Sequence, residues 1–452
     1  MSTASKPYGI NPTRTAVVYL AALFAYTVAV LQRTSFGVVG LEAAQRFSAG
    51  ASVVSMFVVL QLLVYALGQV PAGLLADRFG SRAVITTGAL VMMSGQVILA
   101  FTDSVPVAIA GRALVALGDS FTWTPTSRLL PQWFSARWVP LATQMTAILG
   151  ATGQLLSAFP FAALVHTDGW TTGLLGAAAV GLLAACLAFL CIRNAPAGAV
   201  VTTGPRPGGG TRGQLFEVLR QPGTQTAFFG HWVASSWSMN LIMMWGQPFL
   251  VQGEGYTPAQ AGSLFVWRWA ASAASGLVQG YMTGRHPLRR STLVLIGFVL
   301  GAAPWVAVLA WPGQAPYWLL ALMCLGSGAA EPGGNVSYDI ARTANRKAHT
   351  GTATGVVVMG GFISCLVTTW MIGLTLDLLG GGYTRTDFRI AMSTQFVMQG
   401  LGLAAFLRAR GRARRLDTRT NGTVFLPWRD VIARERQRWR DQHGGDPQAS
   451  GR

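Results

Sequence analysis

Apolar residues along this chain gather in long runs separated by shorter polar stretches. The runs are about 20 residues long, which is what a helix needs to cross a hydrocarbon layer of about 30 Å. Polar and apolar positions do not alternate strictly, so the pattern excludes a β-barrel and indicates helices. It predicts an all-α membrane protein of twelve transmembrane helices, over residues 16–40, 51–73, 83–102, 106–130, 139–164, 170–192, 224–250, 260–283, 291–311, 316–340, 351–376 and 389–408.

One connection is much longer than the others and separates the spans into two sets of six. It is rich in Gly, Pro and Thr, a composition that does not bury itself and is typical of a flexible linker. We therefore expect two six-helix bundles, a linker and a basic tail. The expected boundaries are 1–192 for the N-terminal bundle, 193–223 for a cytoplasmic linker, 224–408 for the C-terminal bundle and 409–452 for a cytoplasmic tail.

Composition and charge support a membrane protein. Only 11% of the 452 residues are charged and 51% are hydrophobic, whereas a soluble domain carries about 25% charged residues. The net charge of +18 comes mainly from loops on one side of the predicted membrane and from the tail, so it does not require a nucleic-acid partner. This positive-inside pattern predicts a multi-pass protein of the cell inner membrane with both termini in the cytoplasm.

The tail contains one segment with a possible structure of its own. In "LPWRDVIARERQRWRD", Trp428, Val431, Ile432 and Trp439 fall on roughly one helical face, with arginines around them. The segment is compatible with a short helix on the inner leaflet, and also with a solvated tail.

The loop after the second predicted span recurs in the second half of the chain. The first copy reads "GLLADRFGSR" and the second reads "GYMTGRHPLR", at an offset of 280 − 73 = 207 residues. The offset aligns Gly73, Arg78 and Arg82 with Gly280, Arg285 and Arg289. Two similar halves in parallel orientation are one way in which transporters are built for alternating access.

The first copy is similar to the signature loop of the major facilitator superfamily, and the resemblance covers spans one to twelve. It implies two pseudo-symmetric six-helix bundles. It also implies that Asp77 faces the start of span eleven and basic residues near the end of span four, a clamp that would hold an outward-open state. The second copy has Gly284 in place of the acid. The candidate gating residues are Gly73, Asp77, Arg78, Gly80, Arg82 and Arg128.

Ionised residues within the first six spans are candidates for a transport site, because a charge in hydrocarbon needs a partner or a cavity. Arg33 in span one could bind an anion through its planar guanidinium, form a structural pair, or extend outward. Arg112 and Asp119 lie seven residues apart in span four and share a helical face. Asp119 could exchange a proton or form a static salt bridge, and Arg112 could instead lie near the outer interface.

The second half offers fewer candidates. Arg268 lies in span eight, and Glu331 lies in span ten, where Pro332 should loosen the helix. Either residue could be a substrate ligand or half of an interhelical pair. Asn240 in span seven stands at the same 207-residue offset from Arg33, which predicts a side chain facing the cavity. His231 is a weaker candidate.

Spans one and four together resemble the anion:cation symporter family. Arg112, Asp119, Pro125, Arg128 and Trp133-Phe134 stand in the order of that family's span four. The resemblance implies that the span-one arginine, here Arg33, binds the anion. The family often has an acid directly before that arginine, whereas this chain has Gln32. Asp119 is then the remaining candidate proton site in this half.

The sequence thus predicts a proton-coupled transporter that moves a small organic anion, of the carboxylate or sugar-acid type, by alternating access. Its candidate substrate residues are Arg33, Arg112, Arg268, Asn240 and Glu331, and its candidate proton carriers are Asp119 and Glu331. We expect a monomer in the lipid bilayer whose partners are the substrate and protons.

Two other classes of function fit the sequence less well. A proton-driven exporter of amphipathic compounds is the alternative, but span five, "LGATGQLLSAFP", lacks the compact Gly-Pro…Gly-Gly pattern of drug antiporters. A membrane enzyme or receptor is disfavoured because the sequence has no metal cluster, nucleophile elbow or phosphate loop. We therefore expect neither enzymatic activity nor a cofactor or metal.

Overall fold

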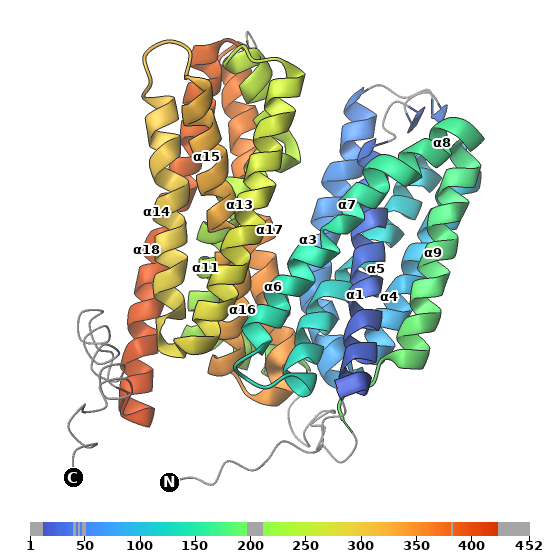
Figure 1. Ribbon diagram of the computed structural model, residues 1–452, viewed down its shortest axis with the longest axis vertical. Coiled ribbons are helices and arrows are strands. Elements are labelled where there is room, and N and C mark those ends of the chain that lie inside the picture. Colours follow the sequence, from blue (N-terminus) through green and yellow to red (C-terminus); the bar gives the residue numbers. More distant parts are fainter. Residues whose placement is uncertain are drawn as a thin grey trace, which may run out of the picture.

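The computed structural model describes residues 12–38, 42–43, 46–47, 51–196, 211–380 and 383–423, and the regular elements in these ranges are helices (Figure 1). The first half contains α1 (Pro12–Val38), α3 (Ala51–Phe79), α4 (Ser81–Phe101), α5 (Val105–Trp133), α6 (Val139–Gly150), α7 (Thr152–Leu156), η1 (Ser157–Phe161), α8 (Ala162–Asp168) and α9 (Trp170–Cys191).

The second half follows α10 (Thr211–Arg220). It contains α11 (Pro222–Asn240), η2 (Leu241–Trp245), α12 (Gly246–Pro248), η3 (Phe249–Gly253), α13 (Pro258–Arg285), η4 (Pro287–Arg289), α14 (Arg290–Leu309), α15 (Tyr317–Ala330), α16 (Gly333–Ala344), η5 (Lys347–His349), α17 (Thr350–Leu378) and α18 (Arg385–Asn421).

Nine helical stretches of the described residues are long and apolar enough to cross a membrane. The other three predicted spans, the seventh, eighth and tenth, are also helical. The seventh is interrupted by the π-helical turns η2 and η3, and α13 is continuous but carries the buried Arg268. The tenth is broken between α15 and α16, at Glu331 and Pro332, which confirms the expected loosening. The fold is therefore consistent with twelve spans.

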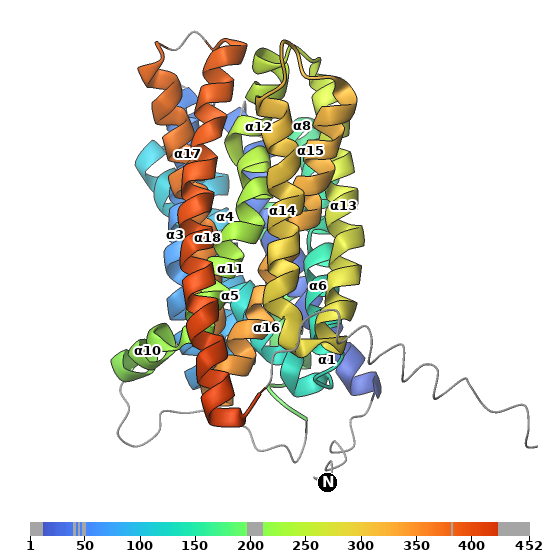
Figure 2. The same cartoon turned by 90° about the vertical axis from the view of Figure 1, so that its left-hand side faces the viewer.

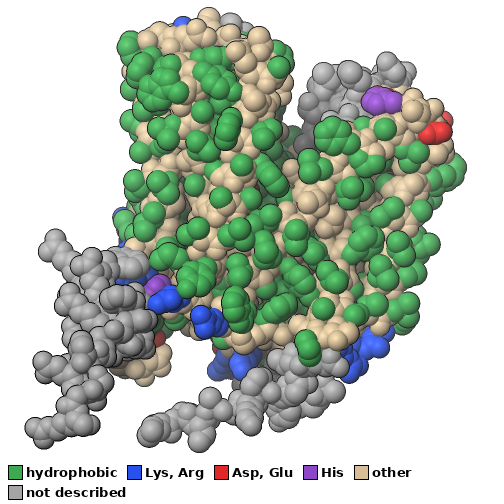
Figure 3. Space-filling view, viewed as in Figure 1, with side chains coloured by type: hydrophobic (Ala, Val, Ile, Leu, Met, Phe, Trp, Pro, Cys, Tyr) green, Lys and Arg blue, Asp and Glu red, His purple; other side chains and the backbone are tan. Residues whose placement is uncertain are grey.

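The helices form two bundles that meet at one end of the molecule (Figure 1). We call this the basic end. It is formed by the α3–α4, α5–α6, α13–α14 and α16–α17 connections, and the described chain begins and ends there. Figure 3 shows Lys and Arg side chains gathered at this end, and apolar side chains over the flanks of both bundles. From there the bundles diverge toward the opposite end, which we call the far end.

Glycines allow the two bundles to approach closely where α3 crosses α17. A Cβ atom on Gly73 would lie 2.3 Å from the carbonyl oxygen of Gly351. A Cβ atom on Gly355 would lie 2.2 Å from the carbonyl oxygen of Gln69. Neither contact is sterically possible for a larger residue, so the backbones pack directly on one another. This crossing explains why the loop motif begins with glycine.

Two boundaries differ from the sequence-based expectation. The predicted linker ends in an ordered helix, α10, which Figure 2 shows at the basic end. α18 continues well past residue 408 and stops at Gly422, whose positive φ of 63° is the usual end of a helix. The first part of the predicted tail is thus helical. The candidate leaflet segment with Trp428 and Trp439 lies outside the described residues.

Candidate functional site

A cavity of about 470 Å³ lies between the two bundles, and both of them supply its walls. Its charged lining residues are Arg33, Arg112, Arg268 and Glu331. Much of the remaining wall is aromatic, from Tyr26, Tyr65, Trp123, Trp269, Tyr338 and Phe362. The cavity is therefore polar at a few points and apolar over much of its area, as expected of a site for a small molecule.

The first bundle presents an ion pair to this cavity. Nε of Arg33 lies 2.6 Å from one carboxylate oxygen of Asp119, and Nη2 lies 2.8 Å from the other. The Asp119 side chain is fully buried, whereas that of Arg33 is 20% exposed. The ring of Tyr65 lies 4.5 Å from the Arg33 guanidinium. Arg33 therefore stands between the carboxylate and the cavity.

Arg112 has a different set of partners. It is fully buried and donates to the backbone oxygens of Gln32 and Arg33, at 3.1 and 2.6 Å, and to Oε1 of Gln61 at 2.5 Å. Its position on the same face of α5 as Asp119 agrees with the seven-residue spacing. The hydrogen bonds of Asp119, however, come from Arg33. Arg112 instead fixes the backbone of α1 at the residue that forms the ion pair.

The second bundle presents its own pair. Nη1 of Arg268 lies 2.6 Å from Oε2 of Glu331, and Ser238 joins the two. Its hydroxyl accepts from Arg268 at 2.5 Å and donates to Glu331 at 2.9 Å. Glu331 sits in the break between α15 and α16, and its side chain is 34% exposed. This carboxylate is therefore more accessible from the cavity than Asp119.

The structure does not bring Asn240 to the cavity. The residue is buried and is absent from the cavity wall, and neither atom of its amide has a hydrogen-bond partner among the described residues. α1 runs without a break through Arg33, whereas the π-helical turn η2 begins directly after Asn240. The two halves thus differ locally in helix geometry, and the sequence offset does not preserve the direction of the side chain.

Several uncharged polar residues also line the cavity. The sequence-based prediction did not include Gln144 and Asn335, and it treated His231 as a weaker candidate. Gln144 on α6 donates to the backbone oxygen of Pro332 at 3.0 Å and accepts from Asn335 at 2.8 Å, which links the first bundle to the helix break beside Glu331. His231 lines the cavity, and its Nδ1 lies 2.8 Å from the backbone oxygen of Val357. Polar residues within apolar runs would have been the signal for all of them.

Asp77 forms the main polar contact between the bundles at the basic end. One of its oxygens accepts from the backbone of Gly351 at 2.9 Å and from Arg128 at 2.8 Å. The other accepts from the backbone and the hydroxyl of Thr352, at 2.8 and 2.7 Å, and from Gln214 of α10 at 3.1 Å. The carboxylate thus sits at the N-terminus of α17, where the helix dipole favours negative charge.

In the described part of the chain, the contacts seen for the other motif residues lie within the first bundle and the segment directly after α9. Nε of Arg82 donates to the backbone of Phe189 at 2.8 Å, at the end of α9. Gly80 has a φ of 83°, and a Cβ atom there would lie 2.2 Å from the side chain of Asn194. Arg78 lies over the ring of Phe79. These residues shape the α3–α4 turn, whereas Gly73, Asp77 and Arg128 serve the contact between the bundles.

This fold and this charged cavity define a membrane transporter. The family model of the Major Facilitator Superfamily matches residues 22–429, nearly the whole chain, so the chain belongs to this superfamily.

Relatives are similar over part of the chain. This chain is 29% identical to human monocarboxylate transporter 7, in a match that covers 33% of this chain and 28% of that protein. It is also 29% identical to monocarboxylate transporter 13 of Bos taurus, in a match that covers 38% of this chain and 41% of that protein. These matches span less than half the length of either relative.

Solved structures share the fold over most of the chain. The fucose:proton symporter FucP of E. coli covers 86% of this chain and 98% of its own, with a TM-score of 0.64 and 14% identity. The match to the human organic anion transporter MFSD10 covers 88% of this chain and 100% of that chain, with a TM-score of 0.63 and 13% identity.

Proposed function

We propose that this protein is a secondary active transporter that moves a small organic anion, of the carboxylate or sugar-acid type, together with protons by alternating access. The observation that carries the proposal is the presence of two arginine–carboxylate pairs, one from each bundle, at a single cavity between the bundles. The names of the relatives, which include monocarboxylate transporters, support the substrate class.

The first pair suggests how an anion and a proton are coupled. A carboxylate that enters the cavity reaches Arg33 first and competes with Asp119 for its guanidinium. Asp119 is fully buried, and its hydrogen bonds among the described residues come from Arg33. An unpaired charge there is costly, so Asp119 takes up a proton when the substrate draws Arg33 away. Substrate and proton therefore favour each other's binding.

The second pair can act in the same way, with two differences. Glu331 is partly exposed, and it keeps a hydrogen bond from Ser238 when Arg268 turns to a substrate. The cost of losing Arg268 is therefore smaller than for Asp119. Through Pro332, the pair is also adjacent to Gln144 of the other bundle. We propose that Glu331 is the second proton carrier and Arg268 the second anion ligand.

We propose that the protein lies in the plasma membrane with its basic end on the cytoplasmic side, because basic loops are retained on that side. The bundles meet there and diverge toward the far end (Figure 1). With this assignment, we propose that the arrangement is an outward-facing state. In this state Asp77 clamps α3 to the first turn of α17. Opening toward the cytoplasm requires that these hydrogen bonds break.

Replacing Asp77 with Asn is expected to shift the protein toward inward-facing states. The amide has no negative charge, so it loses the favourable interactions with the N-terminus of α17 and with Arg128. Each of these interactions stabilises the closed basic end by about 1 kcal/mol. Spin labels on both bundles at the basic end, measured by pulsed electron resonance, should show longer distances. The matched control is Asp103→Asn, at an exposed carboxylate at the far end of the first bundle. Unchanged distances in Asp77→Asn would refute the clamp.

Uptake into proteoliposomes tests the proposed function. We expect labelled short carboxylates or sugar acids to accumulate when a proton gradient is directed inward, and to equilibrate without one. The aromatic wall of the cavity also suits the alternative substrate, an amphipathic compound. Proton-driven efflux of such compounds, with no transport of any acid in the panel, would favour an exporter and reject the anion proposal.

A further inference from the structure

A second cavity, of about 360 Å³, lies within the C-terminal bundle at the basic end. Its walls come from the start of α11, the start of α14, the end of α16 and the extension of α18 beyond residue 408. Among the described residues, none lines both this cavity and the one between the two bundles. The proposed transport mechanism therefore gives it no role.

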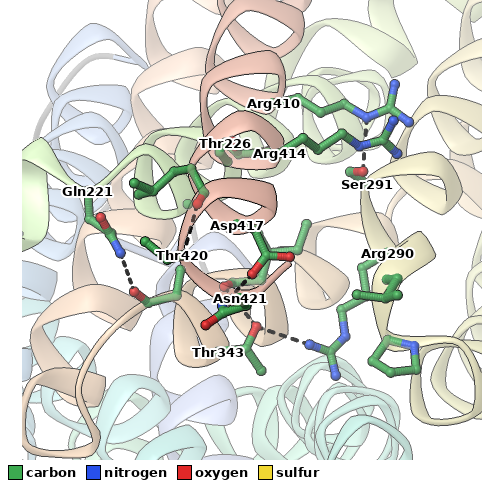
Figure 4. Close-up of a pocket in the computed structure, with 17 residues that line it drawn as sticks. Gln221, Thr226, Arg290, Ser291, Thr343, Arg410, Arg414, Asp417, Thr420 and Asn421 are labelled. Carbon is green, nitrogen blue, oxygen red and sulfur yellow. Dashed lines mark hydrogen bonds between the residues drawn. The ribbon is translucent and has the colours of Figure 1, made fainter. Parts of the chain in front are cut away.

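Among the described residues that line this second cavity, three are arginines and one is a carboxylate. Figure 4 shows Arg410 and Arg414 extending from α18 toward Ser291 of α14, with Arg290 on the same wall farther along. The carboxylate is Asp417, which accepts a hydrogen bond from Asn421 at 2.6 Å. The nearby Asp339 interacts electrostatically with Arg290, but its carboxylate is also paired with Arg342 at 2.7 Å, so it is shared between the two arginines. The described part of the lining therefore carries more arginines than carboxylates.

Arg290 has unused hydrogen-bonding capacity at this wall. The residue is 93% buried, since its exposed fraction is 7%. Its Nη1 donates to the backbone oxygen of Asp339 at 3.2 Å and to the hydroxyl of Thr343 at 3.1 Å. Its Nε has no partner among the described residues. A buried guanidinium N–H without a partner is costly, and a bound anion would satisfy it.

Further donors surround the same space. Arg290 and Ser291 form the first turn of α14, a helix of 20 residues, whose leading N–H groups favour an anion. Arg410 donates to the hydroxyls of Ser291 and Thr292, at 3.0 and 3.1 Å, which holds its guanidinium beside that turn. Arginines, hydroxyls and a helix N-terminus together are the usual partners of a phosphate group.

We propose that this second cavity binds a phosphate group and thereby ties the extension of α18 to α14 and α16. Its volume exceeds what a bare phosphate ion fills, so we expect a phosphate ester. The basic end is also where acidic lipid headgroups would lie if it is cytoplasmic. The phosphate can therefore come from a lipid headgroup or from a soluble compound, and the binding chemistry is the same.

The test compares two double variants of the full-length protein. Arg410→Gln with Arg414→Gln removes two charges from the cavity. Arg412→Gln with Arg415→Gln removes the same charge from exposed positions of the same helix that do not line it. In one arm, pyrophosphate is titrated into protein in phosphatidylcholine nanodiscs. In the other, the nanodiscs contain increasing fractions of phosphatidic acid. Thermal unfolding reports binding in both arms.

We expect the wild-type protein to show a saturable rise in melting temperature in at least one arm. The cavity variant should need about tenfold more ligand, whereas the exposed variant should stay within about twofold. A response confined to phosphatidic acid would identify a lipid headgroup as the ligand. A response confined to pyrophosphate would identify a soluble phosphate compound. No saturable response in the wild type, or equal responses of both variants, would overturn the proposal. If the cavity variant does not fold, Arg410→Gln alone, compared with Arg412→Gln, serves the same test.

Discussion

Replacing Arg33 with Ala is expected to abolish binding and uptake of organic anions. Arg33 is the exposed member of the first pair, so a substrate carboxylate loses its main partner. Loss of a buried charged contact costs about 3 kcal/mol or more, which corresponds to about a hundredfold in affinity. Uptake by proteoliposomes and stabilisation of the purified protein by the same acid should both be lost.

Two further variants separate anion binding from folding. Arg33→Ala leaves Asp119 buried without its partner, so the double variant with Asp119→Asn should recover thermal stability but not uptake. Arg137→Ala, at an exposed arginine of the basic end, is the control for a general loss of positive charge and should transport normally. Normal uptake by Arg33→Ala would reject the assignment of Arg33 as an anion ligand.

Replacing Asp119 with Asn is expected to remove proton-driven accumulation while retaining exchange. The amide can still accept a hydrogen bond from Arg33 but cannot release a proton. Substrate can then bind and exchange for substrate across the membrane, and the proton gradient no longer drives net uptake. Counterflow in proteoliposomes measures exchange, and uptake under an inward proton gradient measures coupling.

The control for this variant is Glu331→Gln, which alters the second pair. If Asp119 is the main proton site, Glu331→Gln should retain part of the gradient-driven uptake, because its side chain is more exposed and has Ser238 as a second partner. Accumulation against a gradient by Asp119→Asn at the wild-type rate would exclude Asp119 as a proton carrier. Loss of coupling in Glu331→Gln alone would transfer that role to Glu331.

The fold was predictable because hydrocarbon imposes a simple rule on the sequence. Long apolar runs have to be helices, and the described helices follow the predicted spans. The break at Pro332 was also readable, since proline has no N–H. The helix α10 could not be predicted, because the Gly- and Pro-rich stretch before it dominated the composition of the linker. The extension of α18 was missed because apolar character ends near residue 408 while the helix continues.

The site was readable only in part. The cost of a charge in a span identified Arg33, Asp119, Arg268 and Glu331, and the structure brings them together as two pairs at one cavity. Which residues pair depends on how the helices pack, and sequence spacing alone suggested Arg112 beside Asp119. Asn240 shows the limit of the repeat, because homologous positions need not point in the same direction when one helix contains a π turn.

Proton coupling, the central feature of the proposed function, can be measured as the movement of protons with the substrate. Proteoliposomes that contain a fluorescent pH indicator are given an organic acid outside, and passive entry is corrected with Arg33→Ala proteoliposomes. We expect acidification of the lumen by the wild-type protein, and none above background by Asp119→Asn, which still exchanges the acid. Uptake of the acid by the wild type without acidification would contradict proton coupling.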